Sequence, residues 1–137
     1  MKDEYEEIIT KIQAVKYPHR HEIEKKANED MEASFVGTVA ELKAAKEKVK
    51  KDCDIAFSEQ VDDYHSTINR LEDELINAVH RDIGFSDEIF NIMWNVAYQR
   101  SHAYGYSEVI IEVEDMYDSV KAIVDLATAE AIAKMSM

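Results

Sequence analysis

The sequence predicts an all-α protein, an elongated helical hairpin or bundle with a long central coiled-coil-like helix and a C-terminal helical hairpin. The 137 residues include three glycines and one proline, too few for the many turns of a β-sandwich or barrel. Ala, Glu, Lys, Leu and Ile fill long uninterrupted runs, and these residue types favour helices. The length and the 46% apolar content predict one domain, residues 1–137, with a real core.

Glycine, proline and capping residues divide the chain into five predicted helices, at residues 2–16, 19–35, 39–82, 87–103 and 108–135. Pro18 ends the first helix and can serve as the first residue of the second. Gly37 can close the second helix, although a helix continuous through it stays open. Thr38, with Glu41 three residues later, has the pattern of a capping box and predicts the start of the third helix.

The third predicted helix contains no glycine or proline and carries a heptad seam. Its members are Phe57, Val61, Tyr64, Ile68, Leu71, Leu75 and Ala78. Such a seam needs a partner helix, supplied either by this chain or by a second copy. Together with the apolar helix that follows, the seam predicts a homodimer.

Gly84 and Ser86 predict the end of the long helix and the cap of the next. The helix over 87–103 is apolar nearly all round, which is typical of a helix at the centre of a core. Its aromatic residues are also candidates for an interface with a partner. The predicted core includes Phe57, Leu71, Leu75, Phe90, Met93, Trp94 and Ile111.

The stretch HAYGYSEV, residues 102–109, has the parts of a helix stop followed by a helix start. Gly105 lets the chain reverse, and Ser107 is the predicted N-cap of the last helix. This joint does not require the polar and aromatic side chains around it, so it is also a candidate functional surface. The candidate partner-binding residues here are Trp94, Tyr98, His102, Tyr104 and Tyr106.

Charge is the strongest global signal, with a net of −13 that is uneven along the chain. Residues 1–60 hold 11 basic and 14 acidic residues, whereas residues 61–137 hold 5 and 15. We therefore expect no direct binding to nucleic acid or to an anionic membrane, and we interpret the lysines of 43–51 as spread around a solvated helix. The acidic candidates for partner binding are Glu108, Glu112, Glu114, Asp115 and Asp118.

No targeting or membrane segment is predicted. The longest run free of Asp, Glu, Lys and Arg is Ile89–Gln99, far short of the roughly 20 apolar residues that span a bilayer. The start of the chain is unlike a signal peptide. The single cysteine, Cys53, falls on an apolar stripe and is interpreted as a small buried hydrophobe. These features favour the cytoplasm.

Catalytic and metal-binding patterns are weak. A di-metal bundle needs several carboxylate–histidine pairs at i, i+3, and the sequence offers one, Asp62 and His65. Glu112, Asp115 and Asp118 have the spacing of one half of a magnesium site in helical pyrophosphatases. We therefore predict no catalytic residues, no metal and no cofactor, and keep a carboxylate–metal hydrolase as a minor alternative.

The region 85–125 combines an aromatic helix, His102, Gly105 and Glu108–Val109 with a following helix that carries Tyr117 and Asp118. It resembles a C-terminal helical hairpin of small accessory proteins encoded by bacteriophages. The resemblance implies a phage or prophage origin and no specific activity. Small acidic proteins of that kind commonly bind a host protein, and some imitate the charge of nucleic acid.

The leading functional prediction is a protein-binding inhibitor or modulator. Its acidic C-terminal half would engage a basic surface on a host protein, such as one that normally holds nucleic acid. The first alternative is a structural coiled-coil or assembly adaptor held by apolar seams. The second is the metal-dependent hydrolase.

Overall fold

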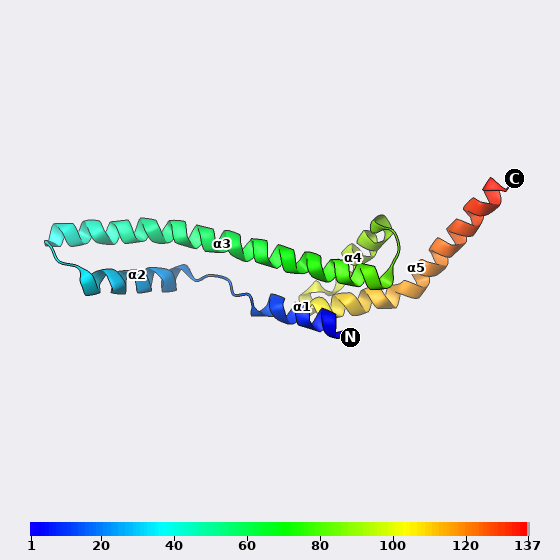
Figure 1. Ribbon diagram of the computed structural model, residues 1–137, viewed down its shortest axis with the longest axis horizontal. Helices are drawn as coiled ribbons and strands as arrows, with labels where there is room; N and C mark the ends of the chain where they lie inside the picture. Colours follow the sequence, from blue (N-terminus) through cyan, green and yellow to red (C-terminus); the bar gives the residue numbers. More distant parts are fainter. Residues whose placement is uncertain (137) are drawn as a thin grey trace. The chain divides into compact units, whose positions relative to one another are not determined.

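A computed structural model of the chain describes residues 1–136, and every regular element among them is helical. The helices are α1 Asp3–Ala14, α2 Arg20–Ser34, α3 Val39–Ile83, α4 Asp87–Ser101 and α5 Tyr106–Met135, with a 3-10 turn, η1 His102–Tyr104, between the last two (Figure 1). The predicted all-α class, the long central helix and the C-terminal hairpin are confirmed.

The break at Gly37 is confirmed, because residues 35–38 are not helical. Thr38 caps α3 as predicted. Its Oγ1 accepts from the backbone N–H of Glu41 at 3.2 Å and donates to Glu41 Oε1 at 3.2 Å. Pro18, in contrast, does not begin α2. That helix starts at Arg20, after His19 in an extended conformation, so the proline lies in the linker.

The chain divides into two compact units. One comprises Ile12–Leu71, and the other comprises Met1–Lys11 and the chain from Glu72 onward. Each unit is described separately below. The single domain predicted for residues 1–137 stays a prediction.

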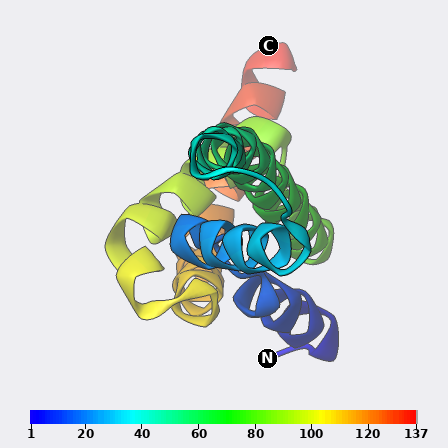
Figure 2. The same ribbon diagram turned by 90° about the vertical axis from the view of Figure 1, so that its left-hand side faces the viewer.

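The unit that contains α4 and α5 holds most of the core. Its buried apolar side chains come from α1, the end of α3, α4 and the start of α5. They are Tyr5, Ile8, Ile9, Leu75, Ala78, Val79, Phe90, Met93, Trp94, Ala97, Val109, Ile110 and Val113. Leu75 and Phe90 are completely buried, and α4 and α5 fold back on each other as a hairpin (Figure 2). The predicted core members Leu75, Phe90, Met93 and Trp94 are confirmed, as is Leu71 in the other unit.

The predictions that Ile111 and Phe57 belong to the core were wrong. Ile111 is 43% exposed, because successive helical residues turn by about 100° and the face that points inward holds Val109, Ile110 and Val113. Phe57 is half-buried, with its ring edge-on to Tyr17 at 6.3 Å between centroids. In both cases the residue type was apolar, but its position on the helix placed it away from a dry interior.

In the other unit, α2 lies alongside the first half of α3 (Figures 1 and 2). No residue of α2 is buried. The two helices are joined by ion pairs, Arg20 Nη2 to Asp54 Oδ1 at 2.5 Å and Lys46 Nζ to Glu32 Oε1 at 3.5 Å. Cys53 on α3 is 3% exposed, which confirms it as a buried side chain.

The corner between α3 and α4 forms as the sequence predicts. Gly84 takes the left-handed conformation at φ 84°, and Phe85 follows it at φ 69°. Ser86 caps α4, since its side chain accepts from the backbone N–H of Ile89 at 3.4 Å. His80 Nε2 lies 3.1 Å from the carbonyl oxygen of Phe85, which accepts its hydrogen bond and ties the corner to α3.

Candidate functional site

The joint between α4 and α5 positions the candidate residues. Gly105 has φ 105° and ψ 169°, a conformation that is essentially restricted to glycine, and its N–H donates to the carbonyl of His102 at 3.1 Å. Helix α5 begins directly after it, at Tyr106. The prediction that Ser107 is the N-cap was therefore wrong. Gly105 holds that place, and Ser107 lies within the first turn.

The five acidic candidates occupy the solvent side of α5. Glu108, Glu112 and Asp115 are spaced i, i+4 and i+7, which places them on one face of the helix. Asp118 and Glu114 lie about 80° and 120° around the helix from Glu108, so the five carboxylates spread over nearly half of its circumference. The inward side of the first two of these turns carries the fully buried Val109, Ile110 and Val113, whereas the inward Tyr117 beneath the later ones is half-buried. The acidic face, defined as these five residues, therefore lies over the core at its start and extends beyond it at Asp118.

Most of the acidic face has no cation beside it. Among the described residues, only Glu112 makes an ion pair, with Arg100 Nη1 at 3.1 Å from its Oε1. Glu108, Glu114, Asp115 and Asp118 are exposed. These four carboxylates form no ion pair with another side chain among residues 1–136.

The aromatic candidates beside the joint lie in different environments. Tyr98 stacks on His102 with 4.8 Å between ring centroids, and His102 Nδ1 donates to the carbonyl of Tyr98 at 2.7 Å. Tyr104 is 80% exposed, whereas the half-buried Tyr106 donates its hydroxyl to Glu72 Oε1 at 2.5 Å. Tyr98, His102, Gly105 and Tyr106 line a hollow of about 100 Å³.

Trp94 contributes mainly to the core. It is 7% exposed, and its ring lies 6.3 Å from that of Phe90 between centroids. Little of its surface is available to a partner. The joint thus presents Tyr98, His102 and Tyr104 as exposed side chains, and a binding role for them stays a prediction.

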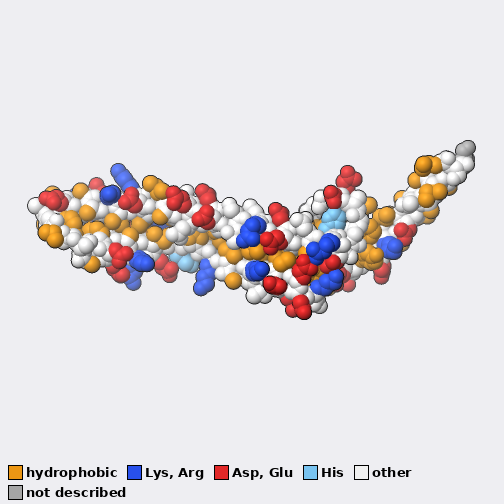
Figure 3. Space-filling model, in the orientation of Figure 1, with side chains coloured by type: hydrophobic (Ala, Val, Ile, Leu, Met, Phe, Trp, Pro, Cys, Tyr) orange, Lys and Arg blue, Asp and Glu red, His pale blue; other side chains and the backbone are white. Residues whose placement is uncertain are grey.

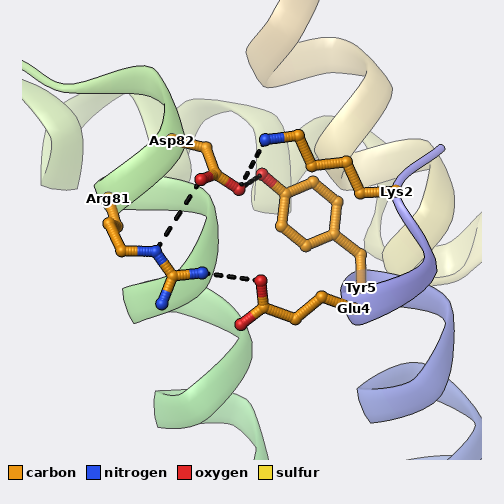
Figure 4. Close-up of polar contacts among 5 residues, drawn as sticks. All are labelled: Lys2, Glu4, Tyr5, Arg81 and Asp82. Carbon is orange, nitrogen blue, oxygen red and sulfur yellow. Dashed lines mark hydrogen bonds and ion pairs between the residues drawn. The ribbon is translucent and has the colours of Figure 1, made fainter.

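A polar cluster between α1 and the end of α3 was not predicted (Figure 4). The Tyr5 hydroxyl donates to Asp82 Oδ2 at 2.5 Å, and Lys2 Nζ lies 3.0 Å from the same oxygen. Arg81 Nη2 pairs with Glu4 Oε2 at 2.6 Å. The Tyr5–Asp82 contact joins residues 77 positions apart, so no local pattern in the sequence could have indicated it.

The cluster shifts two pKa values in opposite directions. Burial, followed by the hydrogen bond to Asp82, raises the pKa of Tyr5 far above its ordinary value of 10.0. The hydrogen bond from Tyr5, followed by that from Lys2, lowers the pKa of Asp82 below its ordinary value of 3.8. The pair therefore exists as a neutral phenol donating to a carboxylate, which ties α1 to α3.

Two larger hollows lie in the unit formed by residues 12–71, and neither was predicted. One, of about 450 Å³, is lined by the linker around Tyr17 and Pro18 and by α3 residues that include Asp63 and Tyr64. The Tyr17 and Tyr64 rings meet edge-on, with 5.1 Å between centroids. Sequence reasoning treated this linker only as a helix stop and did not identify the surface that it forms against α3.

The second hollow, of about 380 Å³, includes part of the lysine run. Lys43, Lys46 and Lys50 line it together, because their spacing of three and four residues places them on one face of α3. Glu24, Glu32 and Glu47 also line it, so the hollow carries no net positive charge. It therefore provides no basic patch for nucleic acid.

The described residues provide no arrangement of ligands for a metal. Within residues 1–136, no three His, Cys, Asp or Glu side chains are grouped so that they could hold an ion. Glu112, Asp115 and Asp118 are thus not joined by ligands from a second helix. In the same part of the chain, no helix is long and apolar enough to cross a membrane.

Comparison with known proteins assigns the chain to a family. No curated protein and no solved structure matches it. The model of a family of unknown function, DUF8546, matches residues 6–121, from within α1 into α5. This match covers most of the 137 residues, and the chain therefore belongs to DUF8546.

Proposed function

We propose that the protein is a protein-binding inhibitor or modulator that captures a basic surface of another protein with the acidic face of α5. The observation that carries this proposal is that four of the five carboxylates form no ion pair among residues 1–136, although the first turns of the helix that bears them are packed into the core. A surface of fixed like charges attracts a partner of opposite charge and orients it as it approaches.

The surroundings of Glu114 support a basic partner. Asp82, Ile83, Glu114 and Tyr117 line a hollow of about 250 Å³ at the end of α3. The side chains of Ile83 and Tyr117 fit the aliphatic stem of lysine or arginine, and the Glu114 carboxylate fits its charged end. A basic side chain would therefore gain both apolar contact and charge pairing there.

The proposal is tested by neutralising the acidic face. We expect Glu112→Gln, Asp115→Asn and Asp118→Asn, combined in one variant, to weaken binding to a fluorescent oligolysine peptide at low salt. Binding by the unchanged protein should fall steeply as salt rises, because exposed charges are screened beyond about 8 Å at physiological ionic strength. The unchanged protein and this variant can each be used as bait in cell lysate. The natural partner is then identified as a protein that the unchanged protein retains and the variant does not.

The matched control changes three exposed acids elsewhere to amides, Glu59→Gln, Asp62→Asn and Asp73→Asn. It alters net charge by the same amount but leaves the acidic face of α5 intact. If both triple variants weaken binding equally, net charge alone is responsible and the proposal is wrong. Binding by the unchanged protein that persists at high salt also contradicts it.

A structural adaptor is the second candidate, favoured by the uninterrupted helix α3. It has 45 residues, and the seam members Val61, Tyr64 and Ile68 are half-buried within it. An adaptor bound through this seam would be nearly indifferent to salt, because apolar contacts are not screened. The salt series therefore separates the two candidates.

A further inference from the structure

The linker between α1 and α2 forms one wall of a hollow against α3. Residues 15–19 are not helical, and together with the start of α2 and one face of α3 they surround about 450 Å³. The α3 wall includes Gln60, Tyr64 and Thr67, whose spacing of four and seven residues places them on one side of the helix. A volume of this size lies within the range of about 300–1,000 Å³ that is typical of small-molecule sites.

Aromatic rings fix the linker against α3. A residue before a proline favours an extended backbone, which suits Tyr17, ahead of Pro18 in the non-helical linker. The Tyr17 ring meets that of Tyr64 at 5.1 Å and that of Phe57 at 6.3 Å between centroids, and it is nearly perpendicular to both. Tyr17 is nevertheless 47% exposed, and it lines the hollow together with Tyr64. The hollow therefore offers two electron-rich rings whose positions are set by their packing.

The charged side chains of this hollow favour a positive ligand. Glu22 from α2 and Asp63 from α3 line it, and both are exposed and form no ion pair within residues 1–136. Arg20 at the start of α2 pairs with other carboxylates instead. The basic residues among the described lining are Lys16 and His19. With His19 neutral, the lining has two negative charges against one positive, which disfavours an anion.

Aromatic rings beside carboxylates are suited to an organic cation. The ring electrons of tyrosine attract a cation that lies over the ring, and a nearby carboxylate adds charge pairing. A metal ion would need several grouped ligands, and residues 1–136 contain no such group. The alkyl groups of an organic cation can also cover apolar surface, and Val15 and Ile23 line the hollow. Along the part of the molecule where α2 lies beside α3, Figure 3 shows apolar side chains with acidic ones next to them.

We propose that this hollow binds a small organic cation of the alkylammonium class. Its ammonium group lies against the rings of Tyr17 and Tyr64 and pairs with Asp63. All the residues that line the hollow belong to the unit of residues 12–71, whereas the acidic face belongs to the other unit. The two sites are therefore distinct, and this proposal does not depend on the proposed function.

Choline is a suitable probe, because a neutral molecule of nearly the same shape exists. In that molecule, the carbon isostere, a carbon atom replaces the nitrogen, so the two ligands differ mainly in charge. We expect the unchanged protein to bind choline at low salt, measured by the broadening of its methyl proton signal in a titration. The carbon isostere should bind at least about tenfold more weakly, because it lacks the attraction to the rings and the carboxylate.

Substitutions in the hollow test which groups hold the cation. Tyr17→Leu removes the ring but keeps an apolar side chain, and it should raise the choline Kd more than about threefold, whereas Tyr17→Phe should have little effect. Asp63→Asn should raise the Kd about two- to fivefold. Asp62→Asn is the matched control, because Asp62 is an exposed neighbour outside the lining and its loss changes net charge equally. Circular dichroism reports that each variant keeps its helices.

Several results would contradict the proposal. One is the absence of saturable choline binding up to about 10 mM, a range that reveals a Kd of about 1 mM. Another is equal affinity for choline and the carbon isostere, a comparison that uses the unchanged protein alone and stands even if Tyr17→Leu does not fold. If Asp62→Asn weakens binding as much as Asp63→Asn, net charge and not this hollow attracts the cation. The triple variant of the acidic face should keep choline binding, and its loss there would place the cation on α5.

Discussion

Helices α2 and α4 both have 15 residues, but they are held in opposite ways. Helix α4 buries five side chains, including the completely buried Phe90 and Ala97. Helix α2 buries none, and its contacts to α3 include exposed ion pairs. Apolar burial contributes far more to stability than exposed ion pairs do. The comparison indicates that α4 opens only with its whole unit, whereas α2 can open locally.

The largest test of this difference is truncation of an apolar side chain on each helix. Phe90→Ala should lower the free energy of unfolding by about 3–5 kcal/mol, because it leaves a cavity in a closed core. The half-buried Ile23 on α2 is the matched position, and Ile23→Ala should cost less than about 2 kcal/mol. Urea denaturation followed by circular dichroism measures both. Equal losses would show that α2 is as firmly packed as α4.

A glycine change at each turn gives the next effect. Gly105→Ala should cost about 1–3 kcal/mol, all of it from backbone strain, because an added Cβ meets no atom within 4 Å. At Gly37, whose φ is not positive, an added Cβ would lie 2.6 Å from Glu41 Oε2 and 2.9 Å from Phe35 Cζ, both at the far ends of side chains that can move aside. Gly37→Ala should therefore cost less in the same urea assay. The reverse order would place the main strain at the α2–α3 turn.

Tyr5→Phe should give a smaller loss of stability that depends on pH. The lowered pKa of Asp82 contributes stability above its unfolded value of 3.8, which is lost as the pH falls through the lower folded value. The raised pKa of Tyr5 contributes stability below 10.0, which is lost as the pH rises above that value. The difference in melting temperature between the two proteins should thus be greatest near neutral pH.

Melting curves across the pH range check this expectation. The gap between the unchanged protein and Tyr5→Phe should narrow at both the acidic and the alkaline ends. A gap that stays constant from pH 3 to pH 11 would mean that the hydroxyl contributes packing and not a charge-dependent hydrogen bond. The gap between the unchanged protein and Lys2→Met, which removes the other donor to Asp82 Oδ2, should also narrow at the acidic end, where Asp82 becomes protonated.

The smallest effect is expected for the ion pair between α2 and α3. Asp54→Asn removes the carboxylate that accepts from Arg20, but both side chains are substantially exposed. The urea midpoint should move less than for any change above, and the difference should shrink further at high salt. A shift comparable to that of Phe90→Ala would mean that α2 depends on this one contact.

Local signals in the sequence predicted the order of the helices well. Gly37, Gly84 and Ser86 each have a fixed role at a helix end, and Gly105 marks a reversal, so the five helices could be located from residue type alone. The predicted start of α5, residue 108, lies two residues after the observed start at Tyr106. The prediction was wrong because a serine two residues after a glycine also matches the pattern of an N-cap. The positive φ of Gly105 makes this glycine, and not Ser107, the N-cap of α5. That backbone angle could not be read from the residue types alone.

Which side of a helix is buried was harder to predict. Ile111 is apolar but shares its side of α5 with Asp115 and Asp118, and residue type gave no warning of this. The Tyr5–Asp82 contact was inaccessible for another reason, since it depends on how distant segments pack. The acidic face itself was predictable, because five carboxylates within eleven residues of one helix must lie largely in water.

The buried thiol of Cys53 can serve as a natural probe of local unfolding. The protein has one thiol, and 3% of that residue is exposed within the unit formed by residues 12–71. A thiol reagent can react with it only when that unit opens, so the labelling rate measures opening without an introduced probe. Because the α4–α5 hairpin contains no cysteine, the reaction follows one unit alone. A variant that loosens α2 should therefore raise the labelling rate of Cys53, whereas local unfolding of the core around Phe90 should leave that rate unchanged.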